Sequence, residues 1–210
     1  GRPDQRPQTR AAPDRTRKFD VEGKSAYAYT GGKLFDPALP LVVFVQGASH
    51  DHSVWALQTR YLAHHGYGIL ALDLSGYGRS AGPPLTSVAD QAAWVLRAVG
   101  AARAAAGARD AAPLYLVGHS MGSLIALEAS GLASEGDRLA GIVLVGTAVP
   151  MPVSEALLSA ADDDEAKAFD LINFWSHSGL THPPGAPGPG FSVFIQNRRL
   201  MERQEKGVLA

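Results

Sequence analysis

The sequence predicts an α/β fold, with a mostly parallel, doubly wound sheet and helices on both of its faces. Two observations carry this prediction. Apolar runs of strand length alternate with helical patterns from residue 41 to residue 146. These runs are almost continuously apolar, which is typical of strands that are buried on both faces of a parallel sheet.

The composition limits the class of protein. A chain of 210 residues with 46% apolar residues can form one domain with a small appendage. The formal net charge is −1, so no basic surface indicates a nucleic acid or an anionic membrane as partner. The chain has no cysteine, which excludes disulfides, thiol catalysis and cysteine-ligated metal, and favours a reducing, cytoplasmic location. The longest uncharged stretch, 111–127, contains proline and glycine and does not predict a membrane span.

The first part of the chain is polar. Residues 1–18 are rich in Arg, Pro, Gln and Thr and are predicted to form a disordered tail. They contain no apolar core of a signal peptide. An arginine-rich targeting segment is the alternative, and the interspersed acids argue against it. Residues 19–29 then alternate as in a β-hairpin, with Glu22-Gly23-Lys24 as its turn.

The core is expected over residues 19–149. Its strands are predicted at the apolar runs 41–45, 68–74, 112–117 and 139–145. A first helix is expected from Ser53 to His65, ending at Gly66. A second begins after Ser87, which forms a capping box with Asp90.

The pattern changes after Val149. Pro150 and Pro152 interrupt the alternation, and short helices are predicted at 154–161, 165–176 and 191–206. Residues 150–210 are therefore expected to form a separate helical segment.

The motif that carries chemistry is Gly118-His119-Ser120-Met121-Gly122. It follows a predicted strand and opens a predicted helix, which is the context of a G-x-S-x-G nucleophile elbow. A serine projected from such a tight turn has a strained backbone, and the flanking residues must be small because they approach closely. Ser120 would lie at a helix N-terminus, where developing negative charge is favoured.

Taken together, these features resemble the α/β-hydrolase superfamily, in its branch with a serine nucleophile and a helical cap. Gln46-Gly47-Ala48 stands where that family usually has His-Gly, and residues 73–80 are similar to its D-x-x-G-x-G-x-S turn. The elbow and the helices after Pro150 occupy the family's positions for nucleophile and cap. The resemblance covers the chain from about Phe19 to its end.

The resemblance implies acyl transfer to water from an ester, a thioester or a similar small molecule, with no cofactor and no metal. Ser120 would be the nucleophile, and the backbone N–H groups of Ala48 and Met121 would form the oxyanion hole. Trp175 and His177 are candidates for substrate contact from the cap, although packing within the cap is the alternative for Trp175. Dehalogenases and epoxide hydrolases are disfavoured because they use aspartate where this chain has Ser120.

The catalytic acid and base are not evident. In this family they follow the serine on later strands, and we see neither strand here. The histidines after Ser120 are His177 and His182, both in the predicted cap. We therefore expect an incomplete α/β-hydrolase fold, truncated and inactive by itself, with recruitment of a cap histidine as the alternative.

Two further expectations follow from the missing strands. A non-catalytic small-molecule-binding protein on the same fold is the second candidate function, because a fold does not fix an activity. A sheet that ends at strand 139–145 would also expose an apolar edge, and such an edge favours self-association.

Several polar residues near the predicted site have two interpretations. Gln46 either substitutes neutrally for the family's histidine or perturbs the oxyanion loop. Asp73 is expected to tie the following turn rather than to act as an acid. His50 and His52 are expected in a solvated loop or helix start, with the pocket mouth as the alternative, and His119 is expected to pack.

A dinucleotide site can be rejected. Gly76-x-Gly78-x-x-Ala81 fits the fingerprint of such sites. The fingerprint must open a helix, and here Gly82-Pro83-Pro84 follows, which does not extend one.

Overall fold

The computed structural model describes residues 16–177 and 193–204. Six strands form one sheet in the order β1-β2-β4-β3-β5-β6. β1 and β2 form an antiparallel hairpin that joins β4 antiparallel, and β4, β3, β5 and β6 run parallel to one another. The strands are β1 (Thr16–Val21), β2 (Lys24–Tyr29), β3 (Leu41–Val45), β4 (Gly68–Asp73), β5 (Leu114–His119) and β6 (Leu139–Val145). The predicted α/β class and mostly parallel sheet are confirmed.

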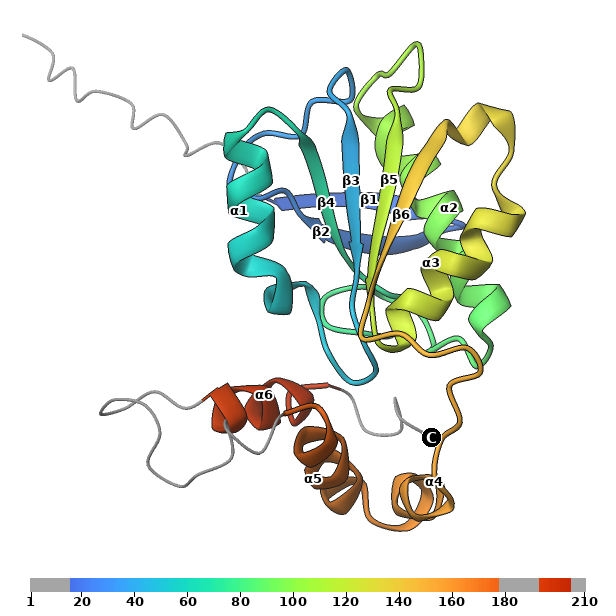
Figure 1. Ribbon diagram of the computed structural model, residues 1–210. Coiled ribbons are helices and arrows are strands. Elements are labelled where there is room, and N and C mark those ends of the chain that lie inside the picture. The colour runs from blue at the N-terminus through green and yellow to red at the C-terminus, as the bar shows by residue number, and fades with distance from the viewer. Residues whose placement is uncertain (1–15, 178–192, 205–210) are drawn as a thin grey trace, which may run out of the picture.

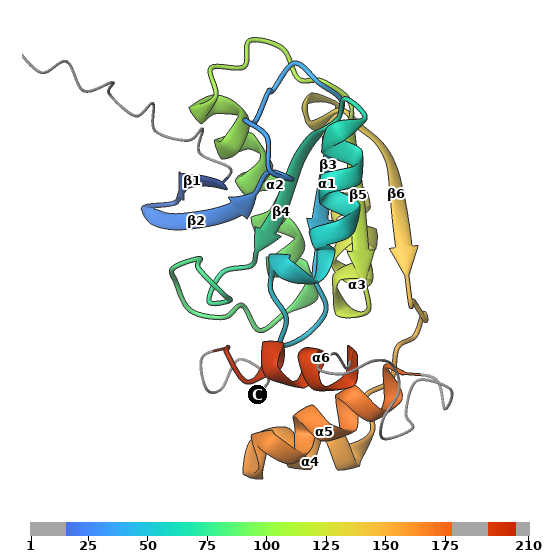
Figure 2. The ribbon, with the colours of Figure 1, turned by 90° about the vertical axis from the view of Figure 1, so that its left-hand side faces the viewer.

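Helices cover the sheet and extend beyond it. Figures 1 and 2 show α1 on one face, α2 and α3 on the other, and α4 to α6 gathered beyond the carboxyl ends of the parallel strands. No helix within the described ranges combines the length and the apolar character that crossing a bilayer requires. The helices are η1 (His52–Trp55), α1 (Ala56–His64), α2 (Val88–Ala105), α3 (Met121–Leu132), η2 (Glu135–Asp137), α4 (Glu155–Asp163), α5 (Glu165–Trp175) and α6 (Val193–Met201).

Burial explains why these segments take these forms. Every residue of β3 and β4 is buried, as a strand covered on both faces requires. β5 alternates between buried and partly buried residues, because its inward side chains face α2 and α3 while the other face is less covered. At the start of α2, the Ser87 side chain accepts the Asp90 N–H, as the predicted cap requires.

One boundary differs from expectation. β1 begins at Thr16, so the last three residues of the predicted tail belong to the sheet, where they pair with 27–29 of β2. Pairing with a neighbouring strand outweighs their polar composition. Residues 1–15 of that tail and His182 lie outside the described residues.

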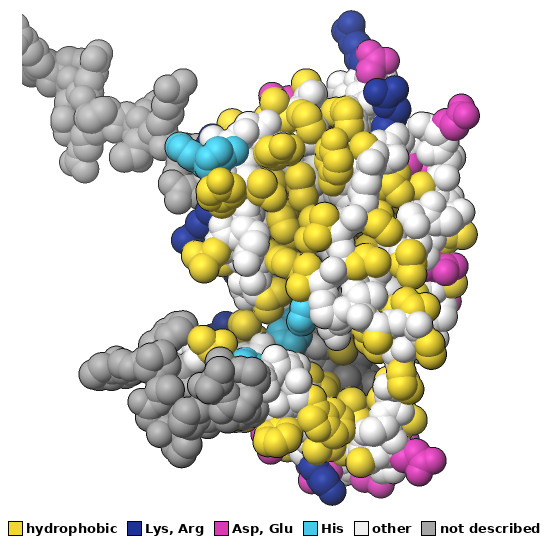
Figure 3. Space-filling view, viewed as in Figure 1, with side chains coloured by type: hydrophobic (Ala, Val, Ile, Leu, Met, Phe, Trp, Pro, Cys, Tyr) yellow, Lys and Arg dark blue, Asp and Glu magenta, His cyan; other side chains and the backbone are white. Residues whose placement is uncertain are grey.

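β6 is an edge strand of the sheet. It pairs with β5, and within the described ranges nothing pairs with its other side. Val143, Leu144 and Val145 are 51%, 37% and 41% exposed. Figure 3 shows apolar side chains spread over this face of the molecule.

Candidate active site

Ser120 stands at the corner between β5 and α3. Its backbone has φ 53° and ψ −123°, a conformation that costs a non-glycine residue about 1–3 kcal/mol. Hydrogen bonds hold the corner on both sides: the Ser120 N–H donates to the Val145 carbonyl at 2.9 Å, and the Ser120 carbonyl accepts the Ser123 N–H at 2.8 Å. Ser120 is partly exposed.

Two glycines make this corner sterically feasible. A Cβ atom at Gly118 would overlap the Gly122 carbonyl, and one at Gly122 would overlap the carbonyls of Val45 and Gln46. The backbones of the end of β5, the start of α3 and the loop after β3 are therefore in direct contact at these glycines. Only glycine fits both positions without moving one of these elements.

The loop after β3 lies against the serine. A Cβ atom at Gly47 would stand 3.3 Å from the Ser120 Cβ. The Gly47 carbonyl accepts the His50 N–H at 3.4 Å, so the Ala48 N–H of the same trans peptide points the opposite way. This N–H has no hydrogen-bond partner among the described residues. The Met121 N–H opens α3, where N–H groups have no partner within the helix.

Gln46 has a structural place in the loop. Its side chain is fully buried, and its amide, oriented to suit its neighbours, donates to the Leu72 carbonyl and accepts the Leu74 N–H. It therefore ties the end of β3 to the end of β4. This favours the neutral interpretation over a perturbed oxyanion loop.

His119 is next to the serine but packs as expected. Its ring meets the Trp55 ring edge-on, with centroids 6.3 Å apart. Burial lowers the pKa of His119, and the charge of His50 lowers it further. Within 16–177 and 193–204, no side chain forms a hydrogen bond with the Ser120 hydroxyl, so no described residue is placed as its general base.

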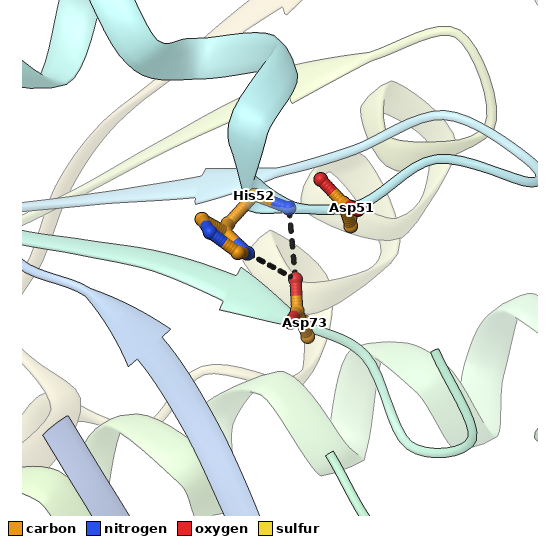
Figure 4. Close-up of side chains that lie close together, drawn as sticks. All are labelled: Asp51, His52 and Asp73. Atoms are coloured by element: carbon orange, nitrogen blue, oxygen red, sulfur yellow. Dashed lines mark hydrogen bonds and ion pairs between the residues drawn. The ribbon is translucent and has the colours of Figure 1, made fainter. Parts of the chain in front are cut away.

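A second polar cluster lies at the end of β4. Figure 4 shows Asp51, His52 and Asp73, whose ligand-type atoms lie within 4.8 Å of one another. Asp73 is fully buried, and its two oxygens accept the His52 N–H, the His52 Nδ1–H and the Arg79 N–H. Asp51 caps η1 through the Ser53 N–H.

These contacts assign the cluster a structural role. Both Asp73 oxygens and Asp51 Oδ1 accept hydrogen bonds from the protein, so these atoms already have partners. His52 packs beside Tyr27 and Tyr29 of β2, on the side of β4 away from β5 and Ser120. Asp73 thus ties the following turn, as the sequence predicts.

His50 was not recognised from the sequence. The expectation of a solvated loop is wrong for this residue, which is only 6% exposed. Its Nε2 lies 2.6 Å from Asn197 Oδ1 of α6, and its Nδ1 lies 2.7 Å from the Ala48 carbonyl. No local signal indicates this contact, because its partner is 147 residues away.

The two cap candidates lie at the end of α5. Trp175 is 53% exposed, and His177 follows the helix with its Nδ1 at 2.7 Å from the Asn173 carbonyl. Substrate contact by either residue stays a prediction. The Arg109-Asp110 loop lines a separate hollow of about 520 Å³, at the amino ends of the strands and away from Ser120.

Comparisons with known proteins agree with this arrangement. The model of the alpha/beta hydrolase family matches residues 42–204. No curated protein matches the sequence.

Solved structures share the fold at low identity. An esterase from Rhodococcus sp. ECU1013 superposes with a TM-score of 0.66 at 22% identity, over 93% of this chain and 71% of that chain. An N-acyl homoserine lactone degrading enzyme, Est816, gives 0.68 at 20% identity, over 92% and 69%. An esterase from Exiguobacterium antarcticum gives 0.64 at 17% identity, over 90% and 68%.

Proposed function

The chain belongs to the alpha/beta hydrolase family, and we propose that it is a serine hydrolase with Ser120 as nucleophile. The substrate is an ester, a thioester or a similar acyl compound of small size, and no metal or cofactor takes part. Esterases and a lactone-degrading enzyme among the structural neighbours support this substrate class.

The conformation of Ser120 is the observation that carries the proposal. A serine held at φ 53° between a strand and a helix is costly, and the structure maintains it with two glycines and two backbone hydrogen bonds. Strain of this kind persists where it serves a function. Here the strained backbone places the Ser120 hydroxyl outside the sheet, beside the loop after β3, whose N–H groups can donate hydrogen bonds.

The proposed first step is attack of Ser120 Oγ on the substrate carbonyl. A bond forms between Oγ and the carbonyl carbon, the carbonyl electrons move to its oxygen, and the hydroxyl proton passes to a base. The N–H groups of Ala48 and Met121 would stabilise the oxyanion, each typically worth about 3 kcal/mol of the barrier. Loss of the alcohol or thiol then leaves an acyl-serine, which water hydrolyses.

We further propose that residues 1–210 alone do not turn over. A serine hydroxyl needs a neighbouring base to be an effective nucleophile, and no described side chain binds to that of Ser120. The acid and the histidine would come from outside this sequence. Recruitment of a cap histidine, His177 or His182, is the alternative.

A fluorophosphonate probe tests the nucleophile. The probe should label Ser120 in the protein that includes the acid and the histidine, and Ser120→Ala should abolish labelling. Ser123→Ala is the matched control, because its hydroxyl is also near the corner but is turned to the Ser120 carbonyl. Equal labelling of the wild type and Ser120→Ala would disprove the assignment.

A non-catalytic binding protein is the second candidate. The absence of a described base supports it. It predicts a folded protein that the probe does not label, and that binds acyl compounds equally well with Ser120 or alanine at this position.

A further inference from the structure

A row of hydrogen bonds runs from the loop after β3 into the cap helices. It starts at the Ala48 carbonyl, passes through the side chains of His50, Asn197 and Asn173, and ends at the Phe194 carbonyl. Its four distances are 2.7, 2.6, 2.9 and 2.9 Å in that order. We call these three side chains the His50 relay.

The two ends of the relay fix the direction of every bond. Asn173 must turn its NH₂ group to the Phe194 carbonyl, so its Oδ1 accepts from Asn197 Nδ2. Asn197 therefore presents Oδ1 to His50 Nε2, while His50 Nδ1 faces the Ala48 carbonyl. Carbonyl oxygens only accept, so both ring nitrogens of His50 must donate.

A neutral imidazole cannot satisfy this arrangement. It has one N–H and one lone pair, so one of the two short contacts would set a lone pair against a carbonyl oxygen. Reversing the two amides only moves the conflict to Phe194. We propose that His50 is a positioning residue that acts as a positively charged imidazolium and holds helix α6 on the loop that carries the Ala48 N–H.

Because two side chains of the His50 relay are buried, its hydrogen bonds contribute to the stability of the fold. His50 is 6% exposed and Asn173 is fully buried, so an unmade hydrogen bond there cannot be replaced freely by water. A second hydrogen bond joins this helix region to the core, from the Gly78 N–H to Gln204 after α6. Loss of the charge on His50 should therefore loosen α6 from the core.

The charged groups around His50 are accounted for by other partners. Asp170 of α5 and Glu202, just after α6, both pair with Arg198, and His177, just after α5, is bonded to the Asn173 carbonyl. On its own loop, His52 pairs with Asp73, and Asp51 caps η1. Of the described carboxylates, none lies within ion-pair distance of His50.

His119 is the remaining ionisable neighbour, at the end of β5. Burial and the charge of His50 both lower the pKa of His119. Figure 3 shows histidine side chains gathered where the core meets the cap helices.

The relay should also affect the proposed chemistry. His50 fixes the loop twice, through its side chain on the Ala48 carbonyl and its N–H on the Gly47 carbonyl. An effect on turnover rests on the proposed function. The attachment of α6 to the core does not depend on that function. The test below therefore uses a readout that needs no activity.

Amide hydrogen exchange of α6 at two pH values tests the proposal. Wild-type protein, measured at about pH 5.5 and about pH 8.5 and corrected for intrinsic exchange, should lose protection in α6 roughly tenfold at the higher pH. His50→Gln and Asn197→Leu should show low protection at both values. His64→Gln, an exposed histidine on α1, is the matched control and should behave as wild type.

A pH-independent α6 in the wild type, or the same pH dependence in His50→Gln, would overturn the proposal. A second measurement needs no variant: in protein labelled with ¹⁵N-histidine, both ring nitrogens of His50 should carry hydrogen at the lower pH while α6 is protected. A neutral tautomer under those conditions would also overturn it. Either result leaves the labelling of Ser120 untouched, so this inference and the proposed function can fail separately.

Discussion

The Oδ1 atom of Asp73 accepts two hydrogen bonds from His52, one from its backbone N–H and one from its ring Nδ1, each at 2.8 Å. The other oxygen of Asp73 accepts the Arg79 N–H at 2.9 Å. One buried carboxylate thus joins the end of β4 to the loop after β3 and to the turn that precedes α2. The loop after β3 is the one that lies against Ser120.

Asp73→Ala should destabilise the protein by about 3 kcal/mol, because two backbone N–H groups and a histidine ring lose their buried acceptor. The free energy of unfolding in urea measures this. Asp110→Ala, in an exposed loop, is the control and should change stability by less than about 0.5 kcal/mol. If Asp73 were instead a catalytic acid, its loss would remove activity from a protein of unchanged stability.

Gly122→Ala should cost roughly 3 kcal/mol or more, or prevent folding, because its Cβ would meet the carbonyls of Val45 and Gln46. Gly131→Ala is a matched control in the same helix. Nothing lies within 4 Å of a Cβ at that position, so alanine should be neutral or stabilise the helix by up to about 1 kcal/mol. Thermal unfolding compares the two. Similar melting temperatures would refute the close approach of the loop and the corner.

The stability of the protein should fall on acidification below about pH 6.5 through His119. Burial, and then the charge of His50, lower the pKa of His119 in the fold below the usual histidine value of 6.5, so the unfolded chain takes up the proton first. His119→Gln cannot titrate and should lose less stability than His64→Gln between about pH 7 and about pH 5. Urea unfolding of both variants at the two pH values measures these losses. All other titrating groups contribute equally to both variants, so their contributions cancel in the comparison. Equal losses would contradict the burial of this ring.

We also propose that the chain self-associates through β6. Its outer edge carries exposed apolar residues and has no partner among the described residues, and such an edge pairs readily with another strand. Val143→Lys should shift the protein toward monomer in sedimentation velocity, because a charge on an edge strand opposes pairing. Leu34→Lys, in an exposed loop, should not. A wild-type protein that is monomeric at all concentrations would refute the proposal.

Local features account for what the sequence could predict. The corner at Ser120 is specified within five residues, by two glycines around a serine between an apolar strand and a helix, so spacing alone indicates it. The continuously apolar runs at β3 and β4 indicate a buried parallel sheet for the same reason.

Contacts between distant residues could not be predicted in this way. Asn197 is a polar residue on a short helix, and nothing in its neighbourhood indicates His50 as its partner. The polar start of β1 likewise depends on β2 rather than on its own composition. Gln46 offered a donor and an acceptor, but only the structure identifies Leu72 and Leu74 as the groups it serves.

The hydrogen bond from the Ser120 N–H to the Val145 carbonyl has a mechanical consequence. Val145 is the last residue of β6, and the chain continues from there to helix α4. A displacement of helices α4 to α6, or a strand that docks beside β6, would thus pull on the same peptide that positions Ser120. Two events at the periphery of the molecule would therefore act on Ser120 through the same hydrogen bond.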